Sequence, residues 1–185
     1  MVVDIGTGTG QAVLRRAKRE PSTLVVGVDA EASAMGDASR KAAAHLKKGG
    51  LPNALFLAEG AERLPGQLAG RADLVTVVLP WGSLLRGILD GDEMMLAALT
   101  GLLNARGQLL LFMSDIDRHD ADTLTERLAG RGLRSIELRP AAESDVVSLS
   151  SGWARRLGIP GSRPAWIIRM EAVNAHSIDR AQHRG

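Results

Sequence analysis

The chain has 185 residues, 45% of them hydrophobic, so it is long enough to bury one sizeable core, and a single domain is expected. It has no cysteine and only four histidines, which excludes disulfides, thiolate metal sites and a cysteine nucleophile and argues against a histidine metal cluster. The net charge of +2 is modest, and no apolar run approaches the length of a membrane span. We therefore expect a soluble cytoplasmic protein that holds no metal and acts as a monomer.

Strand-like apolar segments alternate with helix-like amphipathic segments along nearly the whole chain. In chain order they predict strand 1–5, helix 11–20, strand 23–29, helix 31–47, strand 53–58, helix 61–70, strand 73–80, helix 84–104, strand 107–114, helix 120–130, and strands 133–139 and 164–170. Met94 and Met95 of the fourth predicted helix are expected in the core. This alternation indicates an α/β domain over residues 1–173, with a mostly parallel sheet covered by helices on both faces. Residues 174–185 are predicted to form a polar tail.

A glycine-rich segment, DIGTGTG, begins at Asp4 in the last residues of the first predicted strand and leads into a turn. Gly6, Gly8 and Gly10 allow the backbone to turn sharply and approach a ligand, and the following helix start offers free N–H groups. The second strand ends in Asp29, whose carboxylate can accept both hydroxyls of a ribose. The Asp4 carboxylate would repel a pyrophosphate but suits the cationic amino group and sulfonium of S-adenosylmethionine (SAM).

Two of the three tryptophans lie in predicted turns, although the chain has no tyrosine and only two phenylalanines. The segment LPWGSLLRG places Trp81 after the fourth strand, and SSGWARRLG places Trp153 between the last two strands. Both can face the crevice at the carboxyl ends of the strands. Stacking gains about 1–3 kcal/mol per base and extruding a base costs on the order of a few kcal/mol, so two rings, but not one, could hold a flipped-out nucleobase. The alternative is that such a ring covers the core, as we expect for Trp166.

Positive charge is segregated along the chain. Residues 38–58 contain four lysines and arginines and no acid, and residues 146–170 contain four arginines and no acid. Such segments suit a polyanionic partner such as RNA, because neutralising phosphates releases counterions. The alternative is an ordinary solvated basic face.

Over most of the chain, the glycine turn and its surroundings resemble the Rossmann-like class I SAM-dependent methyltransferases. That resemblance implies a seven-stranded sheet in which the seventh strand is antiparallel and lies between the fifth and sixth. Four segments, LPWGSLLRG, SSGWARRL, KKGGLPN and AERLP, look more specifically like the aminoglycoside-resistance 16S rRNA methyltransferases, which modify N1 of adenine 1408 in the decoding site of the 30S subunit. The similarity runs from Val3 to about Arg163.

The family resemblance assigns three groups of site residues. It implies that Trp81 and Trp153 sandwich the target adenine, and that Ser83 and Ser151 line the reaction pocket. With the glycine turn, it implies a SAM site made of Asp4, Gly6, Gly8, Asp29, Ala61, Glu62 and Leu79. Contacts with RNA phosphates are expected from Arg40, Lys41, Lys48, Arg156 and Arg163, and from Arg155 beside the second tryptophan.

The chain lacks two basic residues of the family pattern, at the positions of Ala44 and His45, and it is shorter than the family in two places. Family members carry an N-terminal extension that forms a hairpin and helps to cover the fold, whereas Met1 falls in the first strand. Two explanations are open, a start codon placed too late or a truncated chain, and both SAM enclosure and rRNA docking depend on whether this extension is present. The stretch from Ser114 to Asp122 is shorter than in the family and lacks its long insertion.

Three other functions remain open on the sequence. The first is a different RNA methyltransferase, for instance one acting on guanine N7 of tRNA. The second is a small-molecule methyltransferase, whose activity should be nearly insensitive to salt. The third is a catalytically inactive protein that binds rRNA and not SAM.

Overall fold

The protein is built around one seven-stranded sheet. The computed structural model describes residues 1–149, 154, 156–159, 161 and 163–173. Across the sheet the strand order is β3-β2-β1-β4-β5-β7-β6. The strands are β1 (Val2–Ile5), β2 (Val25–Asp29), β3 (Ala54–Ala58), β4 (Ala72–Val78), β5 (Leu103–Ser114), β6 (Leu133–Pro140) and β7 (Ala165–Ala172).

The direction of the strands confirms the expected class I arrangement. β1, β2, β3, β4 and β5 pair in parallel with their neighbours, whereas β7 is antiparallel to both β5 and β6 and lies between them. Parallel strands need crossover connections, which the helices supply. The carboxyl ends of β1, β2 and β4 consequently meet at one edge of the sheet, where open α/β sheets bind ligands.

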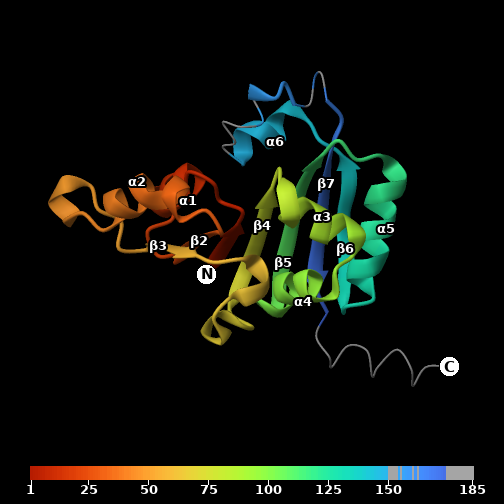
Figure 1. Ribbon diagram of the computed structural model, residues 1–185, viewed down its shortest axis with the longest axis horizontal. Helices are drawn as coiled ribbons and strands as arrows, with labels where there is room; N and C mark the ends of the chain where they lie inside the picture. Colours follow the sequence, from red (N-terminus) through yellow and green to blue (C-terminus); the bar gives the residue numbers. More distant parts are fainter. Residues whose placement is uncertain (150–153, 155, 160, 162, 174–185) are drawn as a thin grey trace.

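Helices cover both faces of the sheet (Figure 1). They are α1 (Gln11–Arg19), α2 (Ala32–Ala42), α3 (Gly82–Asp90), α4 (Glu93–Gly101), α5 (Arg118–Ala129) and α6 (Glu143–Ser148), with short 3-10 turns η1 (Leu46–Lys48), η2 (Ala61–Arg63) and η3 (Gly66–Leu68). Among the described residues, no helix is long and apolar enough to cross a membrane.

Two of the predicted helices are shorter than expected, and one of them is broken at a glycine. The predicted helix 84–104 is two helices, because Gly91 ends α3 in the left-handed conformation (φ 75°) and the Asp92 carboxylate caps α4 by accepting the N–H of Met95 at 2.8 Å. This break leaves Met94 65% exposed, so its expected place in the core is wrong, whereas Met95 is buried. The predicted helix 31–47 ends at Ala42, before a turn that passes through Gly49.

Two further segments differ from the prediction. Residues 61–70 form two 3-10 turns in place of an α-helix, with Pro65 between them. Proline has no N–H to donate and disfavours the helical conformation of the residue before it. Helix α6, in the connection from β6 to β7, was not among the predicted elements.

The apolar core is divided differently on the two faces of the sheet. On one face a single cluster joins the strands to Ile88 of α3, Leu96 of α4 and Leu124 of α5. On the other face one cluster lies under α1 and α2 and a separate one lies under α6, and Leu74 of β4 packs against both. The strip of sheet between these two clusters is the floor of the cavity described below.

The glycine turn is expected to tolerate an added methyl group at Gly8 better than at Gly10. Both have positive φ, so alanine at either position costs about 1–2 kcal/mol of backbone strain. At Gly10, however, a Cβ would lie 2.5 Å from the Phe56 ring and 2.8 Å from the Ala38 Cβ, whereas at Gly8 no atom lies within 4 Å. Gly10→Ala should therefore lose a further ~1–3 kcal/mol of unfolding free energy, measured by urea denaturation without ligand. Equal losses in the two variants would contradict this packing.

Candidate active site

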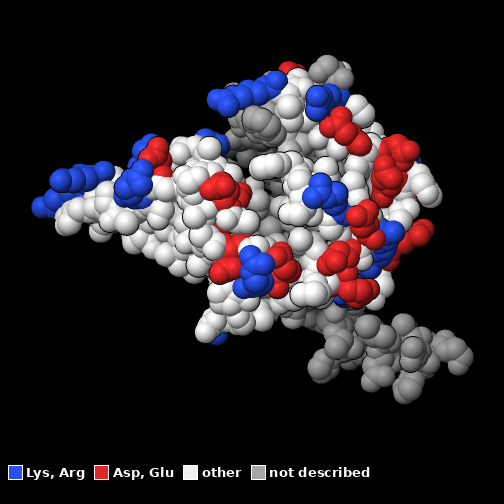
Figure 2. Space-filling model, in the orientation of Figure 1, with Lys and Arg blue, Asp and Glu red and all other residues white. Residues whose placement is uncertain are grey.

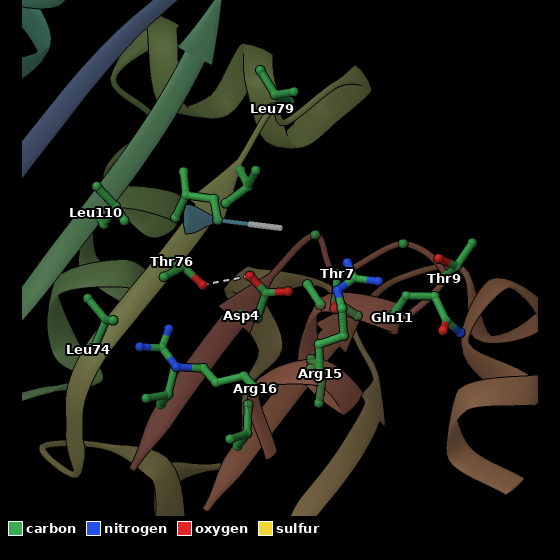
Figure 3. Close-up of a pocket in the computed structure, with 18 of the residues that line it drawn as sticks. Asp4, Thr7, Thr9, Gln11, Arg15, Arg16, Leu74, Thr76, Leu79 and Leu110 are labelled. Atoms are coloured by element: carbon green, nitrogen blue, oxygen red, sulfur yellow. Dashed lines mark hydrogen bonds between the residues drawn. The ribbon is translucent and has the colours of Figure 1, made fainter. Parts of the chain in front are cut away.

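Two adjoining cavities reach the carboxyl ends of β1, β2 and β4. The larger has a volume of about 760 Å³ and runs along the sheet face between α1 and α6, from the carboxyl ends to Val2 and Val25 at the start of β1 and β2. Figure 3 shows residues that line it. The smaller, of about 370 Å³, lies on the side of β2 and η2. Gly6 and Trp81 line both cavities, so the two spaces meet beside the exposed tryptophan.

Asp29 is held by backbone groups at the carboxyl end of β2. Its Oδ2 accepts the N–H of Gly8 at 2.8 Å, and its Oδ1 accepts the N–H of Glu31 at 2.9 Å. Each carboxylate oxygen can accept further hydrogen bonds, so Asp29 presents a fixed acceptor to the smaller cavity. Ala61 and Glu62, from the turn after β3, line the same cavity.

Asp4 brings an ionisable carboxyl group to the floor of the larger cavity. Burial has the largest effect and raises its pKa above the ordinary value of 3.8. The hydroxyls of Thr76 and Thr7 and the positive charge of Arg16 lower the pKa, whereas the negative charge of Asp29 raises it. The Thr76 hydroxyl donates to Asp4 Oδ1 at 2.6 Å (Figure 3).

Trp81 stands on a tightly constrained turn between β4 and α3. Leu79 is buried in the left-handed conformation (φ 50°), which is unusual for a branched side chain, and its N–H donates to the carbonyl of Phe112 at 2.7 Å. Gly82 is also left-handed (φ 61°), and between these residues the Trp81 side chain is 78% exposed. The turn is thus anchored while its largest side chain faces outward, so the alternative of a ring covering the core is wrong for Trp81.

The remaining predicted pocket residues are distributed over both cavities. Leu79 and Gly8 line the larger cavity, and Ser83 lines the smaller. Ser83 does not cap α3, since the N-cap residue is Trp81 and offers no side-chain hydrogen bond. The structure brings Arg156 to the larger cavity, together with Leu149 of the same connection. Trp153, Ser151, Arg155 and the predicted tail 174–185 lie outside the described residues.

The positive segments are only partly free of acids in the folded protein. Arg163 pairs with Asp115 at 3.3 Å, and Arg40 pairs with Asp37 one helical turn earlier. Lys41 and Lys48 are exposed, and no ion pair involves either of them among the described residues. In Figure 2 lysines and arginines gather at the far end beyond α2, where the α2–β3 connection projects from the body of the protein.

Three residues around Asp4 were missed by the sequence reasoning, namely Thr7, Arg16 and Thr76. Thr76 is an isolated polar residue in the apolar run LVTVV, and it is the one polar residue among the buried residues that the structure describes. A polar residue in such a run could have been predicted from the sequence to have a buried hydrogen-bond partner. Its partner could be assigned only from the strand register, which pairs Thr76 with Asp4.

Comparison with known proteins identifies the family of the chain. The model of the family described as "NpmA: 16S rRNA (adenine(1408)-N(1))-methyltransferase" matches residues 1–117. The chain belongs to this family. A 16S rRNA (adenine(1408)-N(1))-methyltransferase of Streptoalloteichus tenebrarius is 36% identical over 173 residues, which cover 85% of this chain and 80% of the relative. One from Escherichia coli is 25% identical over 179 residues, or 87% and 82% of the two chains.

Solved structures of the family share the fold. The 16S rRNA (adenine(1408)-N(1))-methyltransferase of Catenulisporales acidiphilia, a tryptophan-to-alanine mutant crystallised with the cosubstrate SAM, has a TM-score of 0.83 at 31% identity. The alignment covers 94% of this chain and 86% of that structure. The 16S rRNA methyltransferase KamB has a TM-score of 0.81 at 33% identity, covering 93% and 87% of the two chains. These likenesses confirm the class I methyltransferase fold expected from the sequence.

The buried carboxyl group should make the ligand-free protein less stable at neutral pH than an uncharged variant. Because the pKa of Asp4 is raised in the folded state, the folded protein retains this proton above pH 3.8, where the unfolded chain releases it. This contribution to stability is therefore lost as the pH rises through the folded pKa. Asp4→Asn should raise the unfolding free energy at pH 7.5 and weaken SAM binding.

Urea denaturation at several pH values measures this effect. Asp29→Asn is the matched control: it removes a carboxylate that accepts two backbone N–H groups, so no gain in stability is expected. An Asp4→Asn variant no more stable than the wild type at pH 7.5 would contradict the account.

Proposed function

We propose that the chain is a SAM-dependent methyltransferase that modifies N1 of adenine 1408 in the 16S rRNA of the 30S subunit, and thereby confers resistance to aminoglycosides. The observation that carries the proposal is the position of Trp81, an exposed ring on an anchored turn where the two cavities meet. Membership of the family supports the choice of target. The protein acts in the cytoplasm, where the ribosomes are, and as a monomer.

The residues around the two cavities fit SAM as the methyl donor. Asp29 suits the ribose hydroxyls, with Ala61 and Glu62 beside the adenine. The Asp4 carboxylate suits the ammonium of the methionine part, and the buried Thr7 hydroxyl, which makes no hydrogen bond of normal geometry among the described residues, can turn to a ligand. When bound, SAM supplies an electrophilic methyl group.

The target base is held by stacking. Trp81 offers one face, and we assign the opposite face to Trp153, three residues before Arg156 in the chain. Each stacked ring contributes about 1–3 kcal/mol, so two rings offset the cost of a few kcal/mol for taking the base out of its helix. Arg156, at the same cavity, neutralises a phosphate of the displaced backbone.

The chemistry needs positioning more than proton transfer. Adenine N1 carries a lone pair and no proton at neutral pH, so its electron pair forms the bond to the methyl carbon as the carbon–sulfur bond breaks. Catalysis then consists of holding N1 in line with the methyl group. The reaction requires no metal, and no group of three or more histidine, aspartate or glutamate side chains able to hold one occurs in the described part of the chain.

Primer extension across the decoding site tests the proposal. After incubation of 30S subunits with protein and SAM, reverse transcriptase should stop at adenine 1408, because N1-methylation blocks base pairing. Purified tRNA should not be methylated under the same conditions. Methylation of tRNA alone, or of neither RNA, would contradict the assigned target.

Removing the Trp81 ring should abolish methylation without abolishing cofactor binding. We expect Trp81→Ala to lose at least 100-fold in methylation rate, in keeping with about 3 kcal/mol of lost stacking. We expect Trp81→Phe to retain a substantial part of the activity. Calorimetry should show nearly unchanged affinity for SAM in both variants. A Trp81→Ala protein that methylates at the wild-type rate would contradict the role of the ring.

Lys48 should contribute to ribosome binding through charge alone. Lys48→Ala should weaken binding to 30S subunits and reduce the slope of log K against log salt by about one. Arg106→Ala is the matched control, since Arg106 is also exposed but lies in the first half of β5, which three strands separate from β3 and from the connection that carries Lys48. Filter binding at several salt concentrations measures both slopes, and equal slopes for the two variants would contradict the assignment.

A further inference from the structure

Thr76 occupies an unusual place for a polar residue. It lies in the middle of β4, between Val75 and Val77, and only 4% of its surface is exposed. A hydroxyl in such a strand is costly unless it is hydrogen-bonded. Its partner is the Asp4 carboxylate, whose Oδ1 it approaches to 2.6 Å.

The backbone fixes this contact. β1 and β4 are parallel neighbours, and their register places Asp4 directly opposite Thr76. Both residues line the larger cavity, together with Leu74 and Val78 from the same face of β4. An ionised carboxylate can only accept hydrogen bonds, so in this pair the threonine must donate. The hydroxyl therefore favours the charged form of Asp4 and sets its direction.

Thr76 is the strongest of the influences that keep Asp4 charged. Burial and the charge of Asp29, at the end of β2, both raise the pKa of Asp4. Three residues lower the pKa of Asp4. In decreasing order of effect they are Thr76 from β4, Thr7 from the glycine turn and Arg16 from α1. Arg16 also pairs with Glu20 at 3.2 Å, so its charge is shared with a second acid.

We propose that Thr76 is a positioning residue for the methyl donor: its hydroxyl keeps the Asp4 carboxylate ionised and aimed at the ammonium group of SAM. This inference rests on the proposed function. Thr76 itself touches neither the methyl group nor the base, and acts through Asp4. It follows that loss of the hydroxyl changes the pH at which SAM binding fails, because a protonated Asp4 cannot pair with a cation.

The test compares Thr76→Val, which has nearly the same shape but no hydroxyl, with Thr76→Ser, which retains the hydroxyl. The affinity for SAM is measured by calorimetry from pH 4.5 to 7.5, with the wild type alongside. 5′-Methylthioadenosine, which has the adenosine and sulfur of SAM but no amino acid part, is the second probe. Its binding reports whether the cavity is intact without involving Asp4.

We expect the pH midpoint for loss of SAM binding to rise by about one unit or more in Thr76→Val, as befits a lost hydrogen bond to a charged group. Thr76→Ser should keep the wild-type midpoint, and 5′-methylthioadenosine should bind all three proteins alike. An unchanged midpoint in Thr76→Val would overturn the inference. Equal weakening for both probes at every pH would do so too, since it indicates a purely structural role. A wild type that binds no SAM at any pH would refute the proposed function instead.

Discussion

The site depends on keeping one carboxylate charged inside the protein. Asp4 lies at the end of the first strand, on the floor of a cavity, where burial favours its neutral form. Among the groups that favour the charged form by lowering the pKa of Asp4 are the hydroxyl of Thr76 on the neighbouring strand β4 and the positive charge of Arg16 on α1. Both come from elements whose position is set by the sheet, so the charge state of the site follows from strand pairing.

The cavity around Asp4 explains why apolar side chains do not fill the face of the sheet that carries α1, α2 and α6. Its core is split into one cluster beneath α1 and α2 and another beneath α6, and the space between them is the larger cavity. Closing this gap would add buried apolar area and stability. The gap instead holds the carboxylate and, under the proposed function, the methionine part of SAM. The exposed ring of Trp81 at the rim of this cavity also forgoes stabilising apolar burial, because a ring packed inside the core could not stack on a base.

Much of this arrangement could be predicted from the sequence. Apolar runs located all seven strands, and the glycine turn with Asp29 located the ends that meet at the site. The points at which helices end were harder to predict. Gly91 lies inside a long apolar pattern that is equally compatible with one continuous helix. Ion pairs between residues far apart in the chain could not be predicted from the sequence. Arg163 lies in a segment without acids, and only the structure shows that it pairs with Asp115. The sequence shows Thr76 as a polar residue in an apolar strand, but its role follows only from the strand register that pairs it with Asp4.

The most direct measurement is the pKa of Asp4 itself. Protein labelled with ¹³C at the aspartate carboxyl groups can be titrated by NMR, with Asp4→Asn used to assign the signal. The account predicts a pKa above 3.8 in the ligand-free protein and a lower one with saturating SAM, because a ligand that binds the ionised form must lower the pKa. A ligand-free value at or below 3.8, or one that SAM leaves unchanged, would contradict it.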